Sequence, residues 1–267
     1  MAKTETAPLT LDAVRARIDE IDTDLLRLLA ERGRMADAVA TAKIAAGDAA
    51  RFGLRPGRET QILRRLLALP HEGASTSLIV RVWRELMGES LALQGHFSVS
   101  YWGGSDPGRI GSLARMRFGA APGLVQVDRP EDAIAAAKSR GGVGVCALAR
   151  DSAWWGRLLA EPKLKVFAGL PCFAGWGPMS ALAFAAVEIE PTGEDRTFWV
   201  TDATESSAEI REAMGRDGVA ATLLAQAGGL KLFALAGYYM AADERLARAP
   251  GKLSGVIGAA PVLGAEP

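Results

Sequence analysis

The sequence predicts a multidomain chain, with an all-helical N-terminal segment followed by an α/β region. From Leu11 to Ala46, apolar residues recur at alternating spacings of four and three, as they do along one face of an amphipathic helix. After Phe97, short apolar runs alternate with helical patterns, which is typical of a layered α/β fold. The length of 267 residues also favours about two domains.

Composition argues against several classes of protein. Hydrophobic residues make up 49% of the chain and charged residues 23%, which is ordinary for a protein with real cores. The 31 basic and 31 acidic residues cancel, so a nucleic-acid or anionic-membrane partner has no overall electrostatic support. No run of eighteen apolar residues occurs, and Met1 to Leu11 lacks an apolar signal core. We therefore expect neither membrane spanning nor secretion.

The cysteines point to a reducing compartment. Cys146 and Cys172 have no metal-ligand spacing, and both stand in apolar surroundings. We expect them to be reduced core residues in a cytoplasmic protein, with no metal site and no cofactor.

The first indication of function is a break in the apolar stripe of the long helix. Arg32 stands in the series 18, 25, 32 and 39, where an apolar residue is expected, and Lys43 lies nearly on the same face. An unpaired charge there costs on the order of several kcal/mol unless an anion meets it. Arg15 lies roughly 25 Å from Arg32 along the axis, so the two cannot reach one pocket from one chain. The helix, roughly 54 Å long, predicts pairing with a second copy of itself.

Two shorter helices follow, over residues 56–69 and 77–96. Pro56 fits the first turn of the earlier one, and Ser90 and Gln94 fall one turn apart on the later one. The polar residues on the three helices that we expect to share an interior are Arg32, Lys43, Arg58, Glu59, Ser90 and Gln94. Each of them alone has a plainer interpretation as a solvated surface residue. That interpretation weakens when it must hold for all six.

Residues 11–97 resemble the all-helical class of chorismate mutases. The resemblance is carried by LDAVRARIDEIDTDLLRLLAERGRMADAVATAK, RPGRETQILRRL and RELMGESLALQ. It implies a three-helix chain in an intertwined homodimer that rearranges chorismate to prephenate. The site residues that it implies are Arg15, Arg32, Lys43, Arg58, Glu59, Ser90 and Gln94. Arg55 departs from the pattern, because some members of the family carry Asp at that place.

The resemblance also implies a role for each residue. The rearrangement needs no nucleophile and no general base, so the site must hold two carboxylates and stabilise charge on the breaking ether oxygen. Arginine suits the carboxylates because its planar fork binds them bidentately. The implied roles are carboxylate binding by Arg15 of the partner chain, Arg32, Arg58 and Ser90, donation to the ether oxygen by Lys43 and Gln94, and acceptance of the substrate hydroxyl by Glu59. On this basis we expect the helical segment to remain an active dimer without the rest of the chain.

The stretch VSYWGGSDPGRIGSLARMRFG resembles the start of prephenate dehydratases. The family's Glu-Asn-Ser stretch is missing where CALARDSAW stands, and its Thr-Arg-Phe motif is at most the rearranged Arg196, Thr197 and Phe198. This inversion places the cation and the hydroxyl on opposite faces of a strand. The Gly-rich turn at 103–111 is either an anion-binding loop or, more simply, a strand–helix turn.

The segment Thr197–Pro267 predicts strand, helix, strand, strand, helix, strand, the ferredoxin-like order found in ACT regulatory domains. Subtracting it leaves too few residues for the two lobes of a dehydratase, so we expect dehydratase activity to be lost. The alternatives are a bifunctional enzyme, a C-terminal module that binds a regulatory ligand or docks a protein, and a non-catalytic dimeric sensor of chorismate. The expected domains are 8–97 (mutase), 98–196 (truncated dehydratase-like) and 197–267 (ACT-like).

Overall fold

The computed structural model describes residues 10–47 and 52–264. The chain divides into two compact units, Met1–Arg51 and Phe52–Pro267, and each is described here by itself. Residues before Thr10, and 48–51 of the predicted loop, lie outside the described part. Within the described part, no helix is long and apolar enough to cross a membrane.

The first unit contains the single long helix α1 (Leu11–Ala45), as predicted. It begins at Thr10, whose side chain accepts a hydrogen bond from the backbone N–H of Ala13 at 3.3 Å. Gly33 lies within the helix without ending it.

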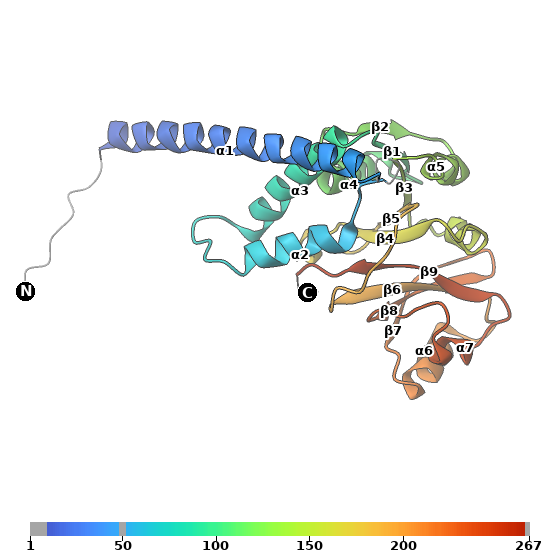
Figure 1. Ribbon diagram of the computed structural model, residues 1–267. Coiled ribbons are helices and arrows are strands. Elements are labelled where there is room, and N and C mark those ends of the chain that lie inside the picture. The colour runs from blue at the N-terminus through green and yellow to red at the C-terminus, as the bar shows by residue number, and fades with distance from the viewer. Residues whose placement is uncertain (1–9, 48–51, 265–267) are drawn as a thin grey trace, which may run out of the picture. The chain divides into compact units, whose positions relative to one another are not determined.

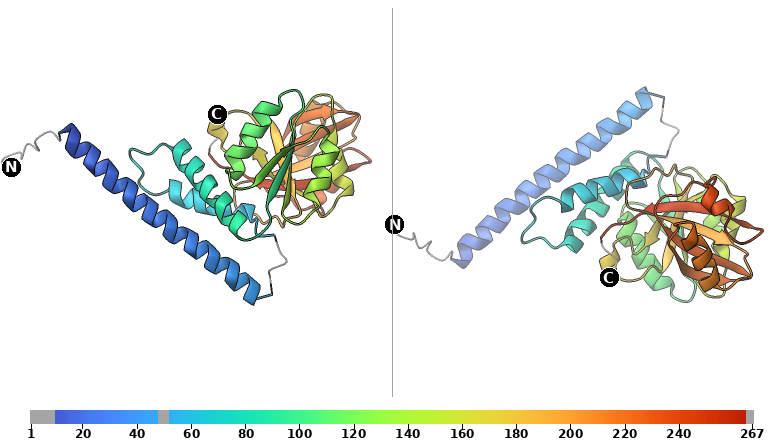
Figure 2. Two further views of the ribbon diagram at one scale, coloured as in Figure 1. Left: turned by 90° about the horizontal axis from the view of Figure 1, so that it is seen from above. Right: turned by 90° about the horizontal axis from the view of Figure 1, so that it is seen from below.

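The second unit opens with α2 (Pro56–Leu67) and α3 (Thr76–Leu93), close to the predicted ranges. Pro56 occupies the first turn of α2, and the Ser75 hydroxyl caps α3 by accepting from the backbone N–H of Leu78. The two helices pack side by side, and α3 also packs on α4 (Pro107–Phe118) (Figure 2). The hairpin of α2 and α3 is therefore part of the same unit as the α/β region.

The rest of the second unit alternates strands and helices, as predicted. Its elements beside α4 are β1 (Ser98–Trp102), β2 (Gly123–Gln126), α5 (Pro130–Ala137), β3 (Gly142–Ala147), η2 (Trp154–Ala160), β4 (Lys165–Leu170), η3 (Ala174–Trp176), β5 (Ala181–Ala185), β6 (Asp195–Thr201), α6 (Ser207–Arg216), β7 (Ala221–Ala227), β8 (Leu230–Ala236), α7 (Glu244–Ala247) and β9 (Ser254–Pro261). Neither β5 nor η2 was predicted.

The nine strands of residues 10–47 and 52–264 form one mixed sheet, in the order β2-β1-β3-β5-β4-β9-β6-β8-β7. β1 pairs in parallel with β2 and β3, whereas β5 is antiparallel to β3 and β4. In Figure 1, α4 and α5 lie beside the β1–β3 end, and α6 and α7 lie beside the end that contains β7 and β8. The N-terminal helical segment followed by an α/β region is thus confirmed.

The last part of the chain has the predicted order of elements, although α7 is only four residues long. Its strands stand in the order β9-β6-β8-β7, and neighbours are antiparallel throughout. These four strands continue the sheet of the preceding segment and do not form a sheet of their own, because β9 pairs in parallel with β4.

The pairing of β9 with β4 depends on a glycine. Gly258 has φ +150°, and a Cβ at this position would lie 2.1 Å from the carbonyl oxygen of Val166. No other residue type fits without moving the strands apart, because Cβ atoms do not approach a backbone oxygen so closely. Gly258 therefore permits the join between the two halves of the sheet.

Candidate functional site

Helix α1 carries three of the predicted site residues: Arg15, Arg32 and Lys43. Arg15 is largely exposed and lies 3.7 Å from the carboxylate of Asp12. Seventeen positions separate Arg15 from Arg32, so the helix holds their Cα atoms roughly 25 Å apart. The predicted offset along the axis is confirmed, since the helix is continuous between them.

The apolar stripe of α1 is exposed in the described chain. The relative exposure is 51% for Ile18, 52% for Leu25 and 49% for Val39. The other apolar residues of the predicted stripe that are exposed are Val14, Ile21, Leu28 and Met35. A contiguous apolar face of this length marks a surface that associates with another protein surface.

At the start of α2, Arg58 is exposed and Glu59 is mostly buried. Arg55 precedes the helix and makes no side-chain cap, and its guanidinium lies 3.9 Å from the exposed carboxylate of Glu190. The residue that departs from the family pattern is thus a surface residue here.

Near the end of α3, Ser90 and Gln94 are half-buried and each makes a local hydrogen bond. The Ser90 hydroxyl donates to the carbonyl of Leu86 at 2.7 Å, and the Gln94 side-chain amide donates to the carbonyl of Ser90 at 2.8 Å. Gln94 is also the C-cap residue of the helix. Since α2 and α3 pack together, the structure brings the Arg58–Glu59 pair and these two residues into one helical hairpin.

Glu59 stands at the centre of a buried cluster of charges. Its Oε2 atom accepts from Arg84 at 2.7 Å and from Arg117 at 2.7 Å. Both arginine side chains are 4% exposed and that of Glu59 is 13% exposed. Oε1 takes part in neither ion pair. The cluster joins three helices, because Glu59 belongs to α2, Arg84 to α3 and Arg117 to α4.

Arg117 is as deeply buried as Arg84, and its guanidinium lies 4.9 Å from the centre of the Phe118 ring. Burial lowers its pKa, and the neighbouring Arg84 lowers it further, while Glu59 acts in the opposite direction. A guanidinium nevertheless keeps its charge. Two cations contact the one carboxylate, so the ion pairs hold Glu59 in one orientation.

The sequence analysis missed Arg84 and Arg117. Arg84 interrupts an apolar stripe on α3, because Val80, Met87 and Leu91 lie on the same face and all are buried. The criterion that selected Arg32 would therefore have selected Arg84. Arg117 interrupts a buried stripe on α4 in the same way, because Ile110, Leu113 and Ala114 lie on its face. Neither stripe indicates that Glu59 is the partner of these two arginines.

The rearranged Arg-Thr-Phe stretch lies on β6, with Arg196 and Thr197 on opposite faces as predicted. Thr197 is fully buried, and its hydroxyl donates to the carbonyl of Gly237 at 2.8 Å and accepts from the backbone N–H of Tyr239 at 2.9 Å. Arg196 is half-buried on the face that it shares with Phe198. The Thr197 hydroxyl thus makes its hydrogen bonds with backbone groups on the face of the sheet opposite to Arg196.

The Gly-rich turn between β1 and α4 ends at Asp106, whose carboxylate caps α4 by accepting from the backbone N–H of Arg109 at 3.0 Å. This arrangement is that of an ordinary strand–helix turn. Cys146 is buried and Cys172 is partly buried, and both are free thiols. Among residues 10–47 and 52–264, no group of His, Cys, Asp and Glu has an arrangement able to hold a metal ion.

These features define an all-helical domain with cationic and amide side chains, joined to a mixed α/β region. Residues 14–95 match the model of the family described as chorismate mutase type II. Over these residues, the chain matches the chorismate mutase type II family.

Three similar proteins share one description, bifunctional chorismate mutase/prephenate dehydratase. The chain is 38% identical over 96 residues to a bifunctional chorismate mutase/prephenate dehydratase of Pseudomonas aeruginosa, covering 35% of this chain and 26% of that protein. It is 36% identical over 95 residues to the protein of that description from Stutzerimonas stutzeri, covering 35% and 26%. For the Neisseria gonorrhoeae protein of that description the identity is 37% over 89 residues, covering 33% and 23%. The matched region spans about a quarter of the length of these relatives.

One solved structure resembles a larger part of the chain. It is described as "GqqA- a novel type of quorum quenching acylases" and covers 61% of this chain and 95% of its own, with 12% identity and a TM-score of 0.41.

Proposed function

We propose that this protein is a chorismate mutase, an isomerase that converts chorismate to prephenate by an intramolecular rearrangement in aromatic amino-acid biosynthesis. The single observation that carries the proposal is the complete set of seven polar residues within the segment that matches the family model. The chemistry asks only for positioning and for stabilisation of negative charge, so these side chains suffice without a cofactor.

The roles we assign are those that the resemblance implies. Arg32 and Arg58 bind the two carboxylates with Arg15 of the partner chain, and Ser90 assists. Lys43 and Gln94 donate to the ether oxygen. These contacts strengthen as charge develops there.

Glu59 is the proposed acceptor for the substrate hydroxyl. The ion pairs with Arg84 and Arg117 support this role, because they fix the orientation of the carboxylate while Oε1 is outside both pairs. The carboxylate is therefore preorganised.

We further propose that the functional form is a homodimer. The exposed apolar stripe of α1 and the separation of Arg15 from Arg32 support a pocket that takes Arg15 from the second chain. The interpretation as a non-catalytic chorismate sensor explains less, because it gives no reason for a complete set of site residues.

We propose that the C-terminal region ends in an ACT-like domain and has lost dehydratase activity. Its strand order and antiparallel pairing support an ACT-like end, and its lack of a recognisable dehydratase motif supports lost dehydratase activity. The second candidate function, a bifunctional mutase–dehydratase, is favoured by the description of the relatives. We propose a cytoplasmic location, as for other enzymes that act on soluble metabolites.

The test is an assay with purified full-length protein. Chorismate absorbance is expected to fall as prephenate forms. Phenylpyruvate is expected only after acid is added, because acid converts prephenate to phenylpyruvate without the enzyme. Phenylpyruvate that forms before acidification would establish the bifunctional alternative. Stable chorismate absorbance with folded, dimeric protein would contradict the mutase proposal and favour the sensor.

A further inference from the structure

The end of α4, in the α/β region, is held against α3 beside the buried cluster of charges. Arg115 donates to three backbone carbonyls of the segment 119–122, at 3.0–3.3 Å, and so fixes the chain just after the helix. The Glu85 carboxylate of α3 accepts from the backbone N–H of Ala120 at 2.7 Å. Both contacts fix the last turn of α4, which carries Arg117.

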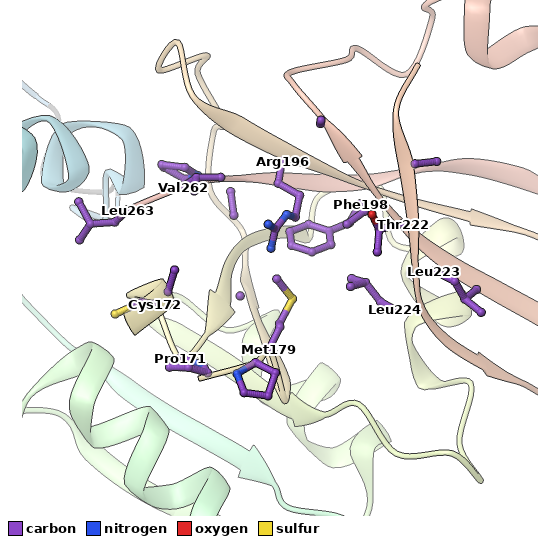
Figure 3. A pocket seen from close by; sticks show the side chains of 18 of the residues that line it. Pro171, Cys172, Met179, Arg196, Phe198, Thr222, Leu223, Leu224, Val262 and Leu263 are labelled. Carbon is purple, nitrogen blue, oxygen red and sulfur yellow. The ribbon is translucent and has the colours of Figure 1, made fainter. Parts of the chain in front are cut away.

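Apolar side chains of the α/β region pack around the Arg117 guanidinium. It lies 4.9 Å from the centre of the Phe118 ring and 5.7 Å from that of the Phe167 ring, and such rings attract a cation. Cys172 packs against the core cluster that contains both rings. Figure 3 shows Cys172 at a cavity of about 550 Å³, with its sulfur directed away from Met179. The described residues that line this cavity do not include Arg117, so protein packing fixes the guanidinium.

Both arginines of the cluster bind the same atom of Glu59. Arg84 and Arg117 each lie 2.7 Å from Oε2, and Oε1 takes part in neither ion pair. The two arginines approach from different helices, α3 and α4, so the carboxylate is held from two sides. Such charge-assisted contacts restrict its rotation, and Oε1 therefore keeps one direction.

We propose that Arg84 and Arg117 are positioning residues of the mutase reaction, which direct Oε1 of Glu59 toward the substrate hydroxyl. The inference rests on the proposed mutase function and on the role of Glu59 in it. Neither arginine touches the substrate, because each acts through the carboxylate. Since Arg117 belongs to α4, the α/β region supplies part of the mutase machinery, and this role requires neither dehydratase activity nor a bound effector.

The test compares chorismate with an analogue in which hydrogen replaces the ring hydroxyl, using the full-length protein. The ratio of the two kcat/KM values measures the contribution of the hydroxyl, and it does not depend on the fraction of the protein that is folded. Relative to the uncatalysed rates, the wild-type protein is expected to prefer chorismate by at least about tenfold, as for a hydrogen bond to a charged group. Arg84→Met and Arg117→Met should each reduce this preference at least about threefold, because the carboxylate is less well aligned.

Three further variants calibrate this ratio. Glu59→Ala removes the acceptor and should abolish the preference. Arg117→Lys keeps a cation but loses the planar fork, so it should show an intermediate preference, and it decides the question if Arg117→Met does not fold. The matched control Arg109→Met changes an exposed arginine of the same helix and should leave the ratio unchanged.

Each unfavourable result has a distinct meaning. A preference that stays at the wild-type level in the folded arginine variants would show that Arg84 and Arg117 support only the fold, and would overturn the inference. Turnover by the wild-type protein without any preference for the hydroxyl would overturn it as well, because Glu59 would then have no contact to direct. Absence of chorismate turnover by the folded wild-type protein would refute the proposed function itself, and the inference with it.

Discussion

Helix α1 and the hairpin of α2 and α3 belong to the same predicted mutase domain, yet they bury their apolar faces differently. The face of α1 is exposed along its length in the described chain. The hairpin is packed into the α/β region, where Leu54 and Leu91 belong to one core cluster with Phe118 and Phe167. This difference supports our proposal that α1 pairs with a second chain, whereas the hairpin is packed within its own unit.

Polar contacts strengthen the attachment of the hairpin. Arg64 donates to three backbone carbonyls of the α/β region, those of Thr192, Glu194 and Val262. On α3, a Cβ at Gly88 would lie 2.0 Å from the carbonyl oxygen of Phe118, so the helix approaches α4 closely only because this residue is glycine. The hairpin of α2 and α3 and the α/β region are thus separate segments of the sequence, but they pack together as one unit.

The largest effect is expected from cutting the chain at that boundary. The sequence led us to expect an active helical dimer after removal of the residues beyond Gln94, but the packing now favours loss of the folded state. Truncation exposes Leu54 and Leu91 and removes Arg117 from Glu59, which leaves Arg84 as its one remaining partner in the cluster.

Circular dichroism and sedimentation check this expectation. The matched control removes residues 1–51, after which residues 52–267 should still unfold cooperatively. A soluble, helical and active product from the first truncation would show that the hairpin does not need the α/β region.

The next largest effect concerns the cations of α1. Arg32→Ala and Lys43→Ala are each expected to lower kcat/KM on the order of a hundredfold or more, because each removes a preorganised positive charge that contacts the substrate. Steady-state kinetics on chorismate provide the measurement. Arg17→Ala is the matched control: Arg17 pairs with Glu20 on the exposed surface of the same helix and should change the rate little. Wild-type turnover in either site variant would refute the assignment.

A smaller kinetic effect is expected from Arg117, which acts on the site only through Glu59. Arg117→Met should lower kcat about tenfold, because the Glu59 carboxylate loses one of the two cations that orient it. Breaking the buried pair should also reduce the free energy of unfolding by roughly 3–5 kcal/mol. Arg117→Lys should restore part of the rate.

A double-mutant cycle separates positioning from general destabilisation. In a Glu59→Gln background, Arg117→Met should cost no further activity, because the two residues act as one unit. Arg109→Met, on the exposed side of the same helix, serves as the control. Additive losses in the cycle would mean that Arg117 supports the fold and not the orientation of Glu59.

The local features of this protein could be predicted from the sequence. The start of α1 at Thr10 and that of α2 at Pro56 depend on capping and proline rules that act within one turn. The strands other than β5 follow from apolar runs. The short run Ala181–Ala185 is rich in alanine, which has little preference for strands, so β5 forms because it is buried between β3 and β4.

Long-range features could not be predicted. The pairing of Glu59 with Arg117, and of Arg64 with carbonyls near the end of the chain, depends on how distant segments meet. The spacing of apolar residues along the sequence does not predict which distant segments come into contact. Domain boundaries at 97 and 196 remain predictions, although one sheet runs through both segments that follow the hairpin.

The smallest effect is expected at Asp243, far from the mutase residues. This carboxylate pairs with Arg245 and caps α7, and the hydrogen bond from Arg245 lowers its pKa from 3.8 to about 2. Because the pKa is lower in the folded state, the ionised carboxylate stabilises the fold at pH values above the unfolded-state pKa of 3.8. This stabilisation decreases as the pH falls from about 4 to about 2.

Asp243→Asn should therefore lower Tm slightly at pH 6 and lower it much less near pH 2. Thermal unfolding of both proteins across this range gives the measurement. An equal difference in Tm at both pH values would mean that the charge of Asp243 contributes nothing.

The central claim is that α1 serves the pocket of a second chain, and complementation between two inactive variants tests it most directly. Arg15→Ala and Arg32→Ala homodimers should both be inactive, since every pocket lacks one carboxylate contact. A heterodimer has one pocket without either arginine and one pocket with both. Random pairing of equal amounts should therefore restore about a quarter of wild-type activity. Activity that stays at the level of the parent variants, with heterodimers confirmed by mass, would contradict the claim.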